Sequence, residues 1–363
     1  MTLTLTTAGE SHGPALVAIV TGLPAGLRLD REAIDADLHR RRQGYGRSPR
    51  QKLESDEVEI LAGLRHGSTL GTPLALLIRN RDHASWEWGM SPWPPPEGER
   101  TGKGTTPVTL PRPGHADLAG ALKFGHDDVR NALERASARQ TAVHVAAGTV
   151  AKTLLAEIGV EVSGTVVEIG GEPVDWNAAT DAARADRDTL GGIVQVTATG
   201  APPGLGSYAD KPDRLDARLA AAVMGIQAVK GVEIGDGFAL ARARGSKAHD
   251  EIEEDRRRAT NRAGGLEAGV TNGEAVVVRA AMKPLPTLMR PLRSVDLESG
   301  EPGEALVERS DVQAVEALAV VAEAAVAWEL ARAAREKFGG DALVDFLGAH
   351  AAYLERIAWP RTH

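Results

Sequence analysis

The sequence predicts an α+β fold. Segments in which apolar residues alternate with polar ones, and segments with apolar residues at helical spacing, follow one another along the chain. They do not keep the strict strand–helix–strand rhythm of a doubly wound parallel sheet. The strand expected at 274–282 follows a glycine-rich stretch rather than a helix, which favours antiparallel pairing. No composition shift or internal repeat marks a boundary, and 363 residues suit one large domain or two ordinary ones.

The composition supports a sizeable core and excludes several classes of protein. Hydrophobic residues make up 42% of the chain and aromatic residues 4%, so we expect an aliphatic core. No apolar window is long enough for a membrane span, and the N-terminus lacks the basic and apolar regions of a signal peptide. The chain has no Cys, so we expect no disulfide, thiolate chemistry or metal site, and a cytoplasmic location. A net charge of -8 argues against a general nucleic-acid binder.

The first elements are a strand, a glycine turn and a second strand. Apolar residues alternate with Thr over 1–7, and 16–20 is a short apolar run. Between them, 9–13 reads Gly-Glu-Ser-His-Gly, which matches the nucleophile elbow of serine hydrolases. That interpretation fails because only eight residues precede the motif, too few for an established parallel sheet. A plain glycine turn with an exposed His is the other alternative. Asp30 then predicts the N-cap of a helix.

A basic run follows this helix. Residues 39–50 hold five Arg around two Gly, a pattern that suggests contact with phosphate or nucleic acid. The alternative is a basic surface loop. The acidic net charge and the lack of further basic stripes favour a small anionic ligand over nucleic acid.

Strands are expected at 57–61 and 74–78, and then a long stretch carries no persuasive element. Residues 80–111 contain three of the six Trp among many Pro and Gly. A segment of this length without secondary structure is usually either functional or disordered. The Trp content argues against a featureless linker, so we expect 80–111 to be a mobile flap near the site.

The centre of the chain combines a turn and a polar helix. Residues 112–117 read Arg-Pro-Gly-His-Ala-Asp, and a helix expected at 127–139 would place Arg135 and Arg139 on one face, with Ser137 nearby. Guanidinium groups bind phosphate and carboxylate in a bidentate way, so this stretch suits a multiply anionic ligand. The alternative for the helix is a solvated face on which Glu134 pairs with its neighbours.

The remaining chain alternates between the two kinds of element. The glycine-rich stretch 264–273 allows close backbone approach to a ligand, but it lacks the Gly-Lys-Ser/Thr of an ATP-binding loop. Ser310 and Asp311 could cap the last long helix. We expect helices at 141–158, from 213 and at 312–337, strands at 160–169, 191–199, 231–239 and 274–282, and a charged loop at 248–261.

Five motifs resemble those of the chorismate synthase family, and they occur in the family's order and with the family's spacing. They are 9–13 and 112–117 together with 40–47, 224–235 and 282–287, and the resemblance runs from residue 9 to about residue 330. It implies a single large α+β domain over 1–363, with helices layered between antiparallel sheets, and a homotetramer.

The resemblance also implies an activity. The family removes phosphate from 5-enolpyruvylshikimate 3-phosphate by 1,4-elimination, giving chorismate in the last common step of the shikimate pathway. It is a carbon–oxygen lyase that requires reduced FMN without net redox change. No dinucleotide fingerprint is present, so two sources of reduced flavin stay open: NADPH used by the chain itself, or an external flavin reductase.

The site residues follow from the same resemblance. Three carry catalytic roles: His12 as an acid near the substrate phosphate, His115 beside the flavin pyrimidine edge, and Asp311 facing flavin N5 and helping to take up the ring proton. Substrate-binding positions are Ser11, Arg41, Arg47, Arg50, Arg112, Ser137, Arg139 and Arg309, and Arg41 and Arg47 also correspond to NADP contacts. FMN-binding positions are Arg135, Ala136, Ser137, Gln227, Ala228, Ala268, Lys283, Pro284, Leu285, Pro286, Thr287 and Arg309.

Two departures from the family pattern stand out. Relatives usually carry Gly where this chain has Ala268, and many read His-Asp-Pro-Cys where it has Ser-Asp-Val-Gln at 310–313. The carboxylate of Asp311 is kept, while the preceding imidazole is not.

Overall fold

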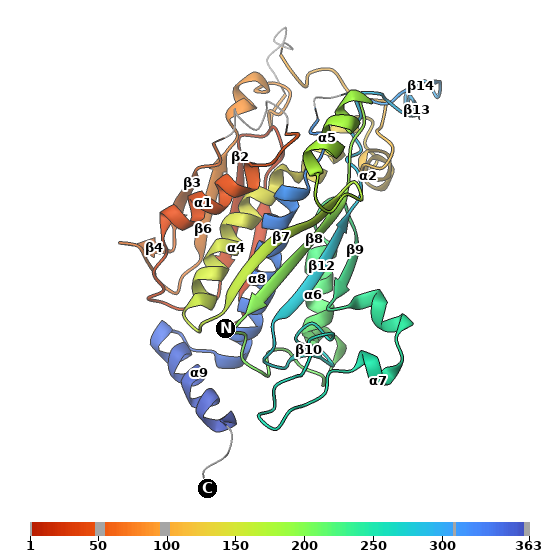
Figure 1. Ribbon diagram of the computed structural model, residues 1–363. Helices are drawn as coiled ribbons and strands as arrows, with labels where there is room; N and C mark the ends of the chain where they lie inside the picture. Colours follow the sequence, from red (N-terminus) through yellow and green to blue (C-terminus); the bar gives the residue numbers. More distant parts are fainter. Residues whose placement is uncertain (1, 48–54, 95–101, 308–309, 359–363) are drawn as a thin grey trace.

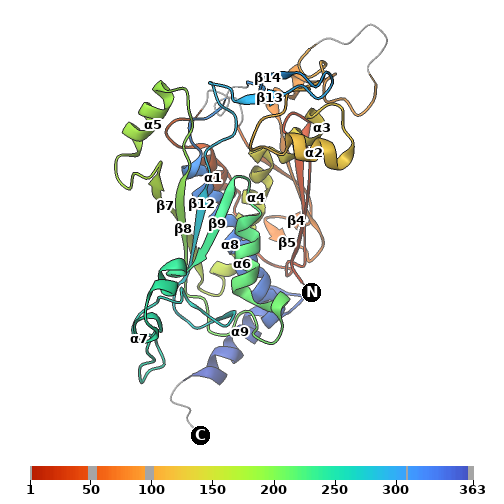
Figure 2. The same cartoon turned by 90° about the vertical axis from the view of Figure 1, so that its right-hand side faces the viewer.

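The computed structural model describes residues 2–47, 55–94, 102–307 and 310–358. These residues form two four-stranded antiparallel sheets with helices between them, as Figures 1 and 2 show from two sides. This arrangement confirms the α+β fold, the antiparallel pairing and the single layered domain. Within the described residues no helix is long and apolar enough to cross a membrane.

The two sheets use different parts of the chain. The first has the order β1-β2-β6-β3 and the second β7-β8-β12-β9, and every neighbouring pair is antiparallel. The strands of the first sheet are β1 (Thr4–Ala8), β2 (Ala15–Thr21), β6 (Leu74–Arg79) and β3 (Val58–Ala62). Those of the second are β7 (Glu161–Ile169), β8 (Gly192–Thr199), β12 (Val276–Met282) and β9 (Val229–Ile234).

Alternation along the strands decides which face meets the helices. In β6, Leu74, Leu76 and Ile78 are fully buried and the residues between them are more exposed. The helices of the middle layer are α1 (Arg31–Arg42), α4 (Thr141–Ala156), α6 (Leu215–Met224) and α8 (Val315–Phe338). Asp30 caps α1 as expected, because its side chain accepts the Glu32 N–H at 2.9 Å. The buried apolar side chains of both sheets and these helices form one continuous core.

Helix α8 lies at the centre of this core and is buried around most of its circumference. A helix packed on several sides carries apolar residues all round rather than on one stripe. Gly148 lets α4 approach α8 closely, because a Cβ at that position would overlap Ala324. Gly164 does the same for β7, where a Cβ would meet the Ala319 carbonyl. These small residues set the distance between layers.

Shorter elements surround the two sheets. The additional strands are β4 (Leu64–Arg65), β5 (Ser68–Thr69), β10 (Leu266–Glu267), β11 (Val270–Thr271), β13 (Arg293–Val295) and β14 (Pro302–Glu304). The additional helices are α2 (Asp117–Phe124), α3 (Arg130–Ala136), α5 (Trp176–Ala185), α7 (Gly245–Ala248) and α9 (Leu343–Ile357). Helix α9 lies at the end of the molecule near the C-terminus (Figure 1).

The structure corrects the helix expected at 127–139. Helix α3 ends at Ala136, Ser137 is extended with φ -62° and ψ 141°, and a short 3₁₀ turn leads into α4. The Ser137 hydroxyl accepts the Arg139 N–H at 3.3 Å, which restarts the chain as an N-cap does. Arg135 and Arg139 therefore do not share a helix face.

Two further boundaries differ from the sequence expectation. The last long helix begins at Val315, so Ser310 and Asp311 do not cap it; the Gln313 side chain accepts the Val315 N–H at 2.7 Å instead. The strand expected at 231–239 is β9, which ends at Ile234 and is followed by a 3₁₀ helix at Gly237–Arg242. In the first case the side chain that caps the helix is a Gln three residues further along than the Ser that residue type predicts.

Candidate active site

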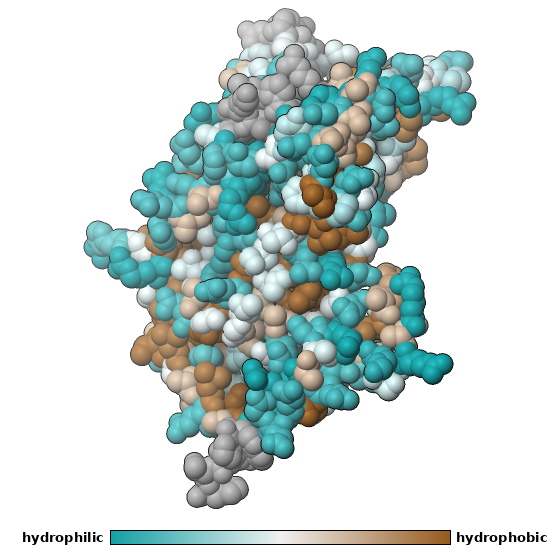
Figure 3. Space-filling model, viewed as in Figure 1, coloured by the Kyte–Doolittle hydropathy of each residue, from teal (hydrophilic) through white to brown (hydrophobic). Residues whose placement is uncertain are grey.

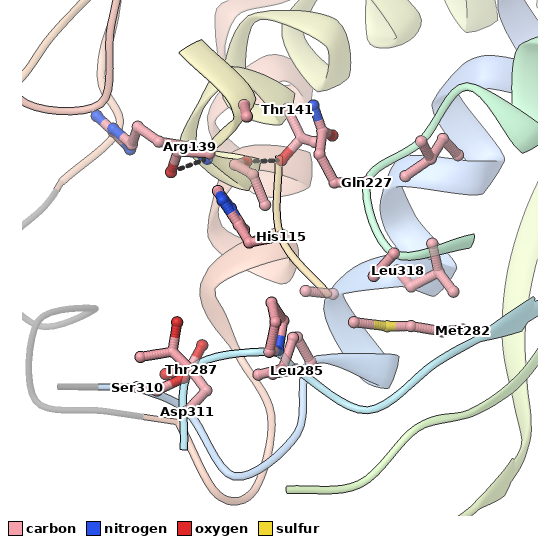
Figure 4. Close-up of a pocket in the computed structure, with 18 of the residues that line it drawn as sticks. His115, Arg139, Thr141, Gln227, Met282, Leu285, Thr287, Ser310, Asp311 and Leu318 are labelled. Carbon is pink, nitrogen blue, oxygen red and sulfur yellow. Dashed lines mark hydrogen bonds between the residues drawn. The ribbon is translucent and has the colours of Figure 1, made fainter. Parts of the chain in front are cut away.

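A cavity of about 530 Å³ lies where several loops and α8 meet. Figure 4 shows side chains from distant parts of the sequence around it, among them His115, Gln227, Met282, Asp311 and Leu318. The lining side chains come from the turn at 112–116, the break between α3 and α4, the α6–β9 turn, the loop after β12 and segment 310–314. Fifteen of the expected site residues line it: Ser11, Arg41, Arg47, Arg112, His115, Ala136, Ser137, Arg139, Gln227, Ala228, Lys283, Leu285, Pro286, Thr287 and Asp311.

Two arginines of the cavity wall share one buried carboxylate. Arg41 reaches Asp56 at 3.1 Å through its terminal nitrogen and donates to Thr141 Oγ1 at 2.8 Å through Nε. Arg139 also contacts Asp56, and its Nε donates to Asn80 Oδ1 at 2.9 Å. Burial lowers the pKa of Arg41 to about 10 even though Asp56 opposes this shift, so the guanidinium stays charged near neutral pH. Two cations facing one anion leave this wall positive.

Arg47 and Asp311 lie together on another part of the wall. The backbone N–H of Val312 donates to the Gly46 carbonyl at 2.9 Å, which holds the two loops side by side. The guanidinium of Arg47 then lies 3.2 Å from the Asp311 carboxylate. The Asp311 carboxylate faces the cavity and the Arg47 cation, and it does not cap α8, which begins only at Val315.

A second buried carboxylate, Asp117, organises the turn at 112–115. It accepts the Arg112 backbone N–H at 3.0 Å and Nε–H at 2.8 Å, and it also contacts His115 Nδ1. Arg112 reaches further, to Thr287 Oγ1 at 3.0 Å. Burial acts to raise the pKa of Asp117, but hydrogen bonds from His115 and Arg112 outweigh it and hold the pKa well below its usual range.

His12 is buried next to the cavity rather than in its lining. Its Nδ1 lies 2.8 Å from Glu134 Oε1, and its backbone N–H donates to Glu134 Oε2, also at 2.8 Å. Its ring stacks on Trp86 with centroids 4.0 Å apart. The alternative of an exposed His in a plain turn is therefore wrong, because His12 is 7% exposed. The alternative that the helix containing Glu134 presents a solvated face is also wrong. Glu134 is buried and binds His12, which lies 122 positions away in the sequence.

Part of the segment at 80–111 packs against this histidine. A 3₁₀ helix at Arg81–Ser85 corrects the expectation of no regular element there, and it leads to the buried Trp86. Arg130 lies 5.0 Å from the Trp86 ring centre, and Gly104 approaches the ring so closely that a Cβ would lie 2.7 Å from it. The described part of the segment thus packs beside His12, but none of its described residues line the cavity. That the segment is a mobile flap stays a prediction.

Besides His12, three expected site residues, Arg135, Ala268 and Pro284, are described by the structure but do not line the cavity. Arg135 donates to the carbonyls of Thr7 and Gly9 at 3.1 and 3.0 Å, so it ties α3 to the end of β1. Ala268 forms the turn between β10 and β11 with a φ of 50°, outside the cavity lining. Pro284 belongs to the loop after β12 but is not among the lining residues. Arg50 and Arg309 lie outside the described residues.

Sequence reasoning missed Asp56, Asn80, Glu134 and Thr141, and gave no separate role to Asp117. Asp117 was visible as the last letter of the 112–117 motif. No local signal indicates Asp56, because its partner Arg139 lies 83 positions away. Among the described residues, no group of His, Asp and Glu side chains is arranged to hold a metal ion.

Known proteins share both the sequence and the fold. A family model described as chorismate synthase matches residues 3–334. Chorismate synthase of Rubrobacter xylanophilus is 54% identical over 388 aligned positions, covering 98% of this chain and 97% of that protein. The enzyme of Desulforudis audaxviator is 53% identical, covering 97% of each. A crystal structure of chorismate synthase superposes with a TM-score of 0.78 at 36% identity, covering 98% of both chains. This chain belongs to the chorismate synthase family.

Proposed function

We propose that this chain eliminates phosphate from 5-enolpyruvylshikimate 3-phosphate to give chorismate, as a carbon–oxygen lyase at the last common step of the shikimate pathway. The observation that carries the proposal is the charge of one cavity. Among the described residues, its lining contains five cations, Arg41, Arg47, Arg112, Arg139 and Lys283, and the carboxylate of Asp311. A substrate with one phosphate and two carboxylates needs such a wall, since charge-assisted hydrogen bonds to guanidinium groups are strong and often bidentate.

One nitrogen of this wall is suited to an incoming anion. The buried Nε of Arg47 has no hydrogen-bond partner among the described residues, while another nitrogen of the same group binds Asp311. A buried donor left unsatisfied costs about 1–3 kcal/mol, and an anionic oxygen would recover that free energy. This free donor is the reason for proposing that Arg47 binds the substrate.

The apolar part of the cavity lining suits a flat aromatic cofactor, and reduced FMN is the one we propose. Ile226, Met282, Leu285 and Leu318 present apolar side chains to the cavity, whose lining also contains the polar Gln227. Pockets for cofactors combine such apolar walls with a few fixed polar groups. Bound reduced FMN would supply electron density to the departing phosphate without net redox change.

The chain's own residues then divide the remaining work. His12 is the proposed proton donor to the leaving phosphate; Glu134 holds its Nδ1, so the transferable proton is at Nε2. Asp311 is the proposed acceptor of the ring proton, held by Arg47. His115 would lie at the edge of the cofactor, held by Asp117.

An anaerobic assay with pre-reduced FMN and the named substrate tests the proposal through phosphate release. His12→Ala and His115→Ala should each lose most turnover while still folding, whereas the exposed His249 offers a matched control in His249→Ala. Absence of release by folded, flavin-saturated protein would contradict the assignment. Adding NADPH to oxidised FMN under the same conditions decides the source of reduced flavin: bleaching means self-reduction, and no bleaching means an external reductase.

We further propose that the chain assembles as a homotetramer in the cytoplasm. The outward face of the second sheet is open in Figure 1, and Figure 3 shows apolar and neutral residues among the hydrophilic ones over it. Ile193, Val277 and Ala281 point to this side and are half-buried. Analytical ultracentrifugation at micromolar concentration should give the mass of four chains, and a monomer would refute the assembly.

A further inference from the structure

One buried carboxylate organises both functional groups of the turn at 112–115. Asp117 is the first residue of α2 and is fully buried. Its Oδ2 accepts two N–H groups of Arg112, from the backbone at 3.0 Å and from Nε at 2.8 Å. Its Oδ1 contacts His115 Nδ1 and lies 3.2 Å from a terminal nitrogen of Arg112. Both oxygens are therefore used by groups that lie in or next to the cavity.

The contact with His115 determines which ring nitrogen carries the hydrogen. Nδ1 also lies 3.2 Å from a terminal nitrogen of Arg112, which can only donate. The contact with the Asp117 carboxylate is the shorter of the two, and an ionised carboxylate only accepts hydrogen bonds, so we assign the hydrogen to Nδ1, which donates to Asp117. The pKa of Asp117 lies well below its usual range, because the hydrogen bonds from His115 and Arg112 outweigh burial, so the carboxylate is ionised at neutral pH. In a neutral imidazole this leaves Nε2 without a hydrogen and able to accept a proton.

The contact with Arg112 fixes the other end of the turn. The guanidinium is held between Asp117 and Thr287, to which it donates at 3.0 Å. Lys283, from the same loop as Thr287, donates to the carbonyl of Gly114 inside the turn. These hydrogen bonds join the turn at 112–115 to the loop after β12. Asp117 provides the negative charge that holds the Arg112 guanidinium in this position.

We infer that Asp117 is a positioning residue for the reaction, which holds His115 as the Nδ1–H tautomer with Nε2 available to the cavity and holds Arg112 against the Thr287 loop. The part of this inference that concerns turnover rests on the proposed function, whereas the part that concerns the tautomer of His115 is independent of it. The same logic governs other enzymes in which a buried carboxylate orients a histidine, where amide replacement leaves the geometry but imposes the wrong tautomer.

The test reads the histidine directly in flavin-free protein. Long-range ¹H–¹⁵N spectra of ¹⁵N-histidine-labelled protein, above the titration range of the rings, distinguish the two neutral tautomers, and the His115→Ala variant identifies the signal. Wild-type His115 should be the Nδ1–H tautomer. In Asp117→Asn the new amide group can donate to Nδ1, so the signal should shift towards the Nε2–H tautomer.

A matched control separates this effect from loss of any carboxylate in the region. Asp128 accepts the N–H groups of Val108 and Arg130, both at 2.9 Å, and does not line the cavity. Asp128→Asn should therefore leave the His115 tautomer unchanged. A wild-type His115 in the Nε2–H form would overturn the inference even if the Asp117 variant failed to fold.

Turnover provides the second measurement. Asp117→Asn should lower kcat by about 10²–10⁴-fold, the range expected when a general acid or base is lost or misoriented. Asp117→Glu, which keeps the charge, should recover part of this loss. A switched tautomer with wild-type turnover would overturn the positioning role. If wild-type protein released no phosphate, the proposed function would fail while the tautomer result still stood.

Discussion

Replacing Asp56 by Asn should destabilise the protein by about 3–5 kcal/mol, the usual cost of removing one partner from a buried ion pair. Asp56 is 2% exposed and is the shared counter-ion of Arg41, at 3.1 Å, and of Arg139. Asn has nearly the same shape. It also tolerates the positive φ of 51° at this position, a region that Asn and Asp enter more readily than most residues. The substitution therefore removes charge with little other change.

This loss of unfolding free energy can be converted into a change in Tm. An unfolding entropy of about 2.1 cal/mol/K per residue, over 363 residues, is about 0.76 kcal/mol/K. A loss of about 3–5 kcal/mol then lowers Tm by about 4–7 °C. Asp56→Ala should cost roughly 1 kcal/mol more, because alanine lacks the polar group that eases the left-handed conformation. Added phosphate should recover part of the loss, since a bound anion replaces the missing counter-charge.

Scanning calorimetry in a phosphate-free buffer, followed by a phosphate titration, measures these shifts. Asp255→Asn is the control, because the ion pair of Asp255 with Arg257 is exposed, with side chains 54% and 74% accessible. Such surface pairs contribute about 0–1 kcal/mol. An Asp56→Asn protein with the stability of the control would refute the claim that this carboxylate holds the two arginines.

Three further predictions concern the cavity and the core. Asp311→Asn should lower turnover by about 10²–10⁴-fold in the phosphate-release assay, and a rate near wild type would end its catalytic role. Ser310→Ala should stay within a few-fold of wild type. The fluorescence of Trp86 and protease cleavage within 80–111 should change when FMN and substrate bind, and unchanged cleavage at saturation would mean that the segment is not a flap. Gly148→Val should destabilise by about 1–3 kcal/mol or prevent folding, because the side chain would enter the α4–α8 contact; a wild-type denaturation midpoint would show that the helices can separate there.

Local patterns of residue type along the sequence predicted most of the helices and strands. The alternation over 74–78 predicts β6, and Asp30 predicts the start of α1, because both depend on side chains a few positions apart. Helix α9 was not expected, and the helix over 127–139 was expected to be continuous. In the second case the Ser137 hydroxyl competes with the helix for the Arg139 N–H, and residue spacing does not show which of them prevails.

By itself, the sequence determined the fold class, the order of most elements and, through its motifs, which residues gather at one cavity. Only the tertiary structure decided how those residues are held. Asp56 joins Arg41 to Arg139, and Glu134 holds His12 across 122 positions. Nothing near these residues in sequence marks such contacts. Periodicity records which face of an element is buried, whereas the partner of a buried charge is determined by which distant segment the packing of the layers brings beside it.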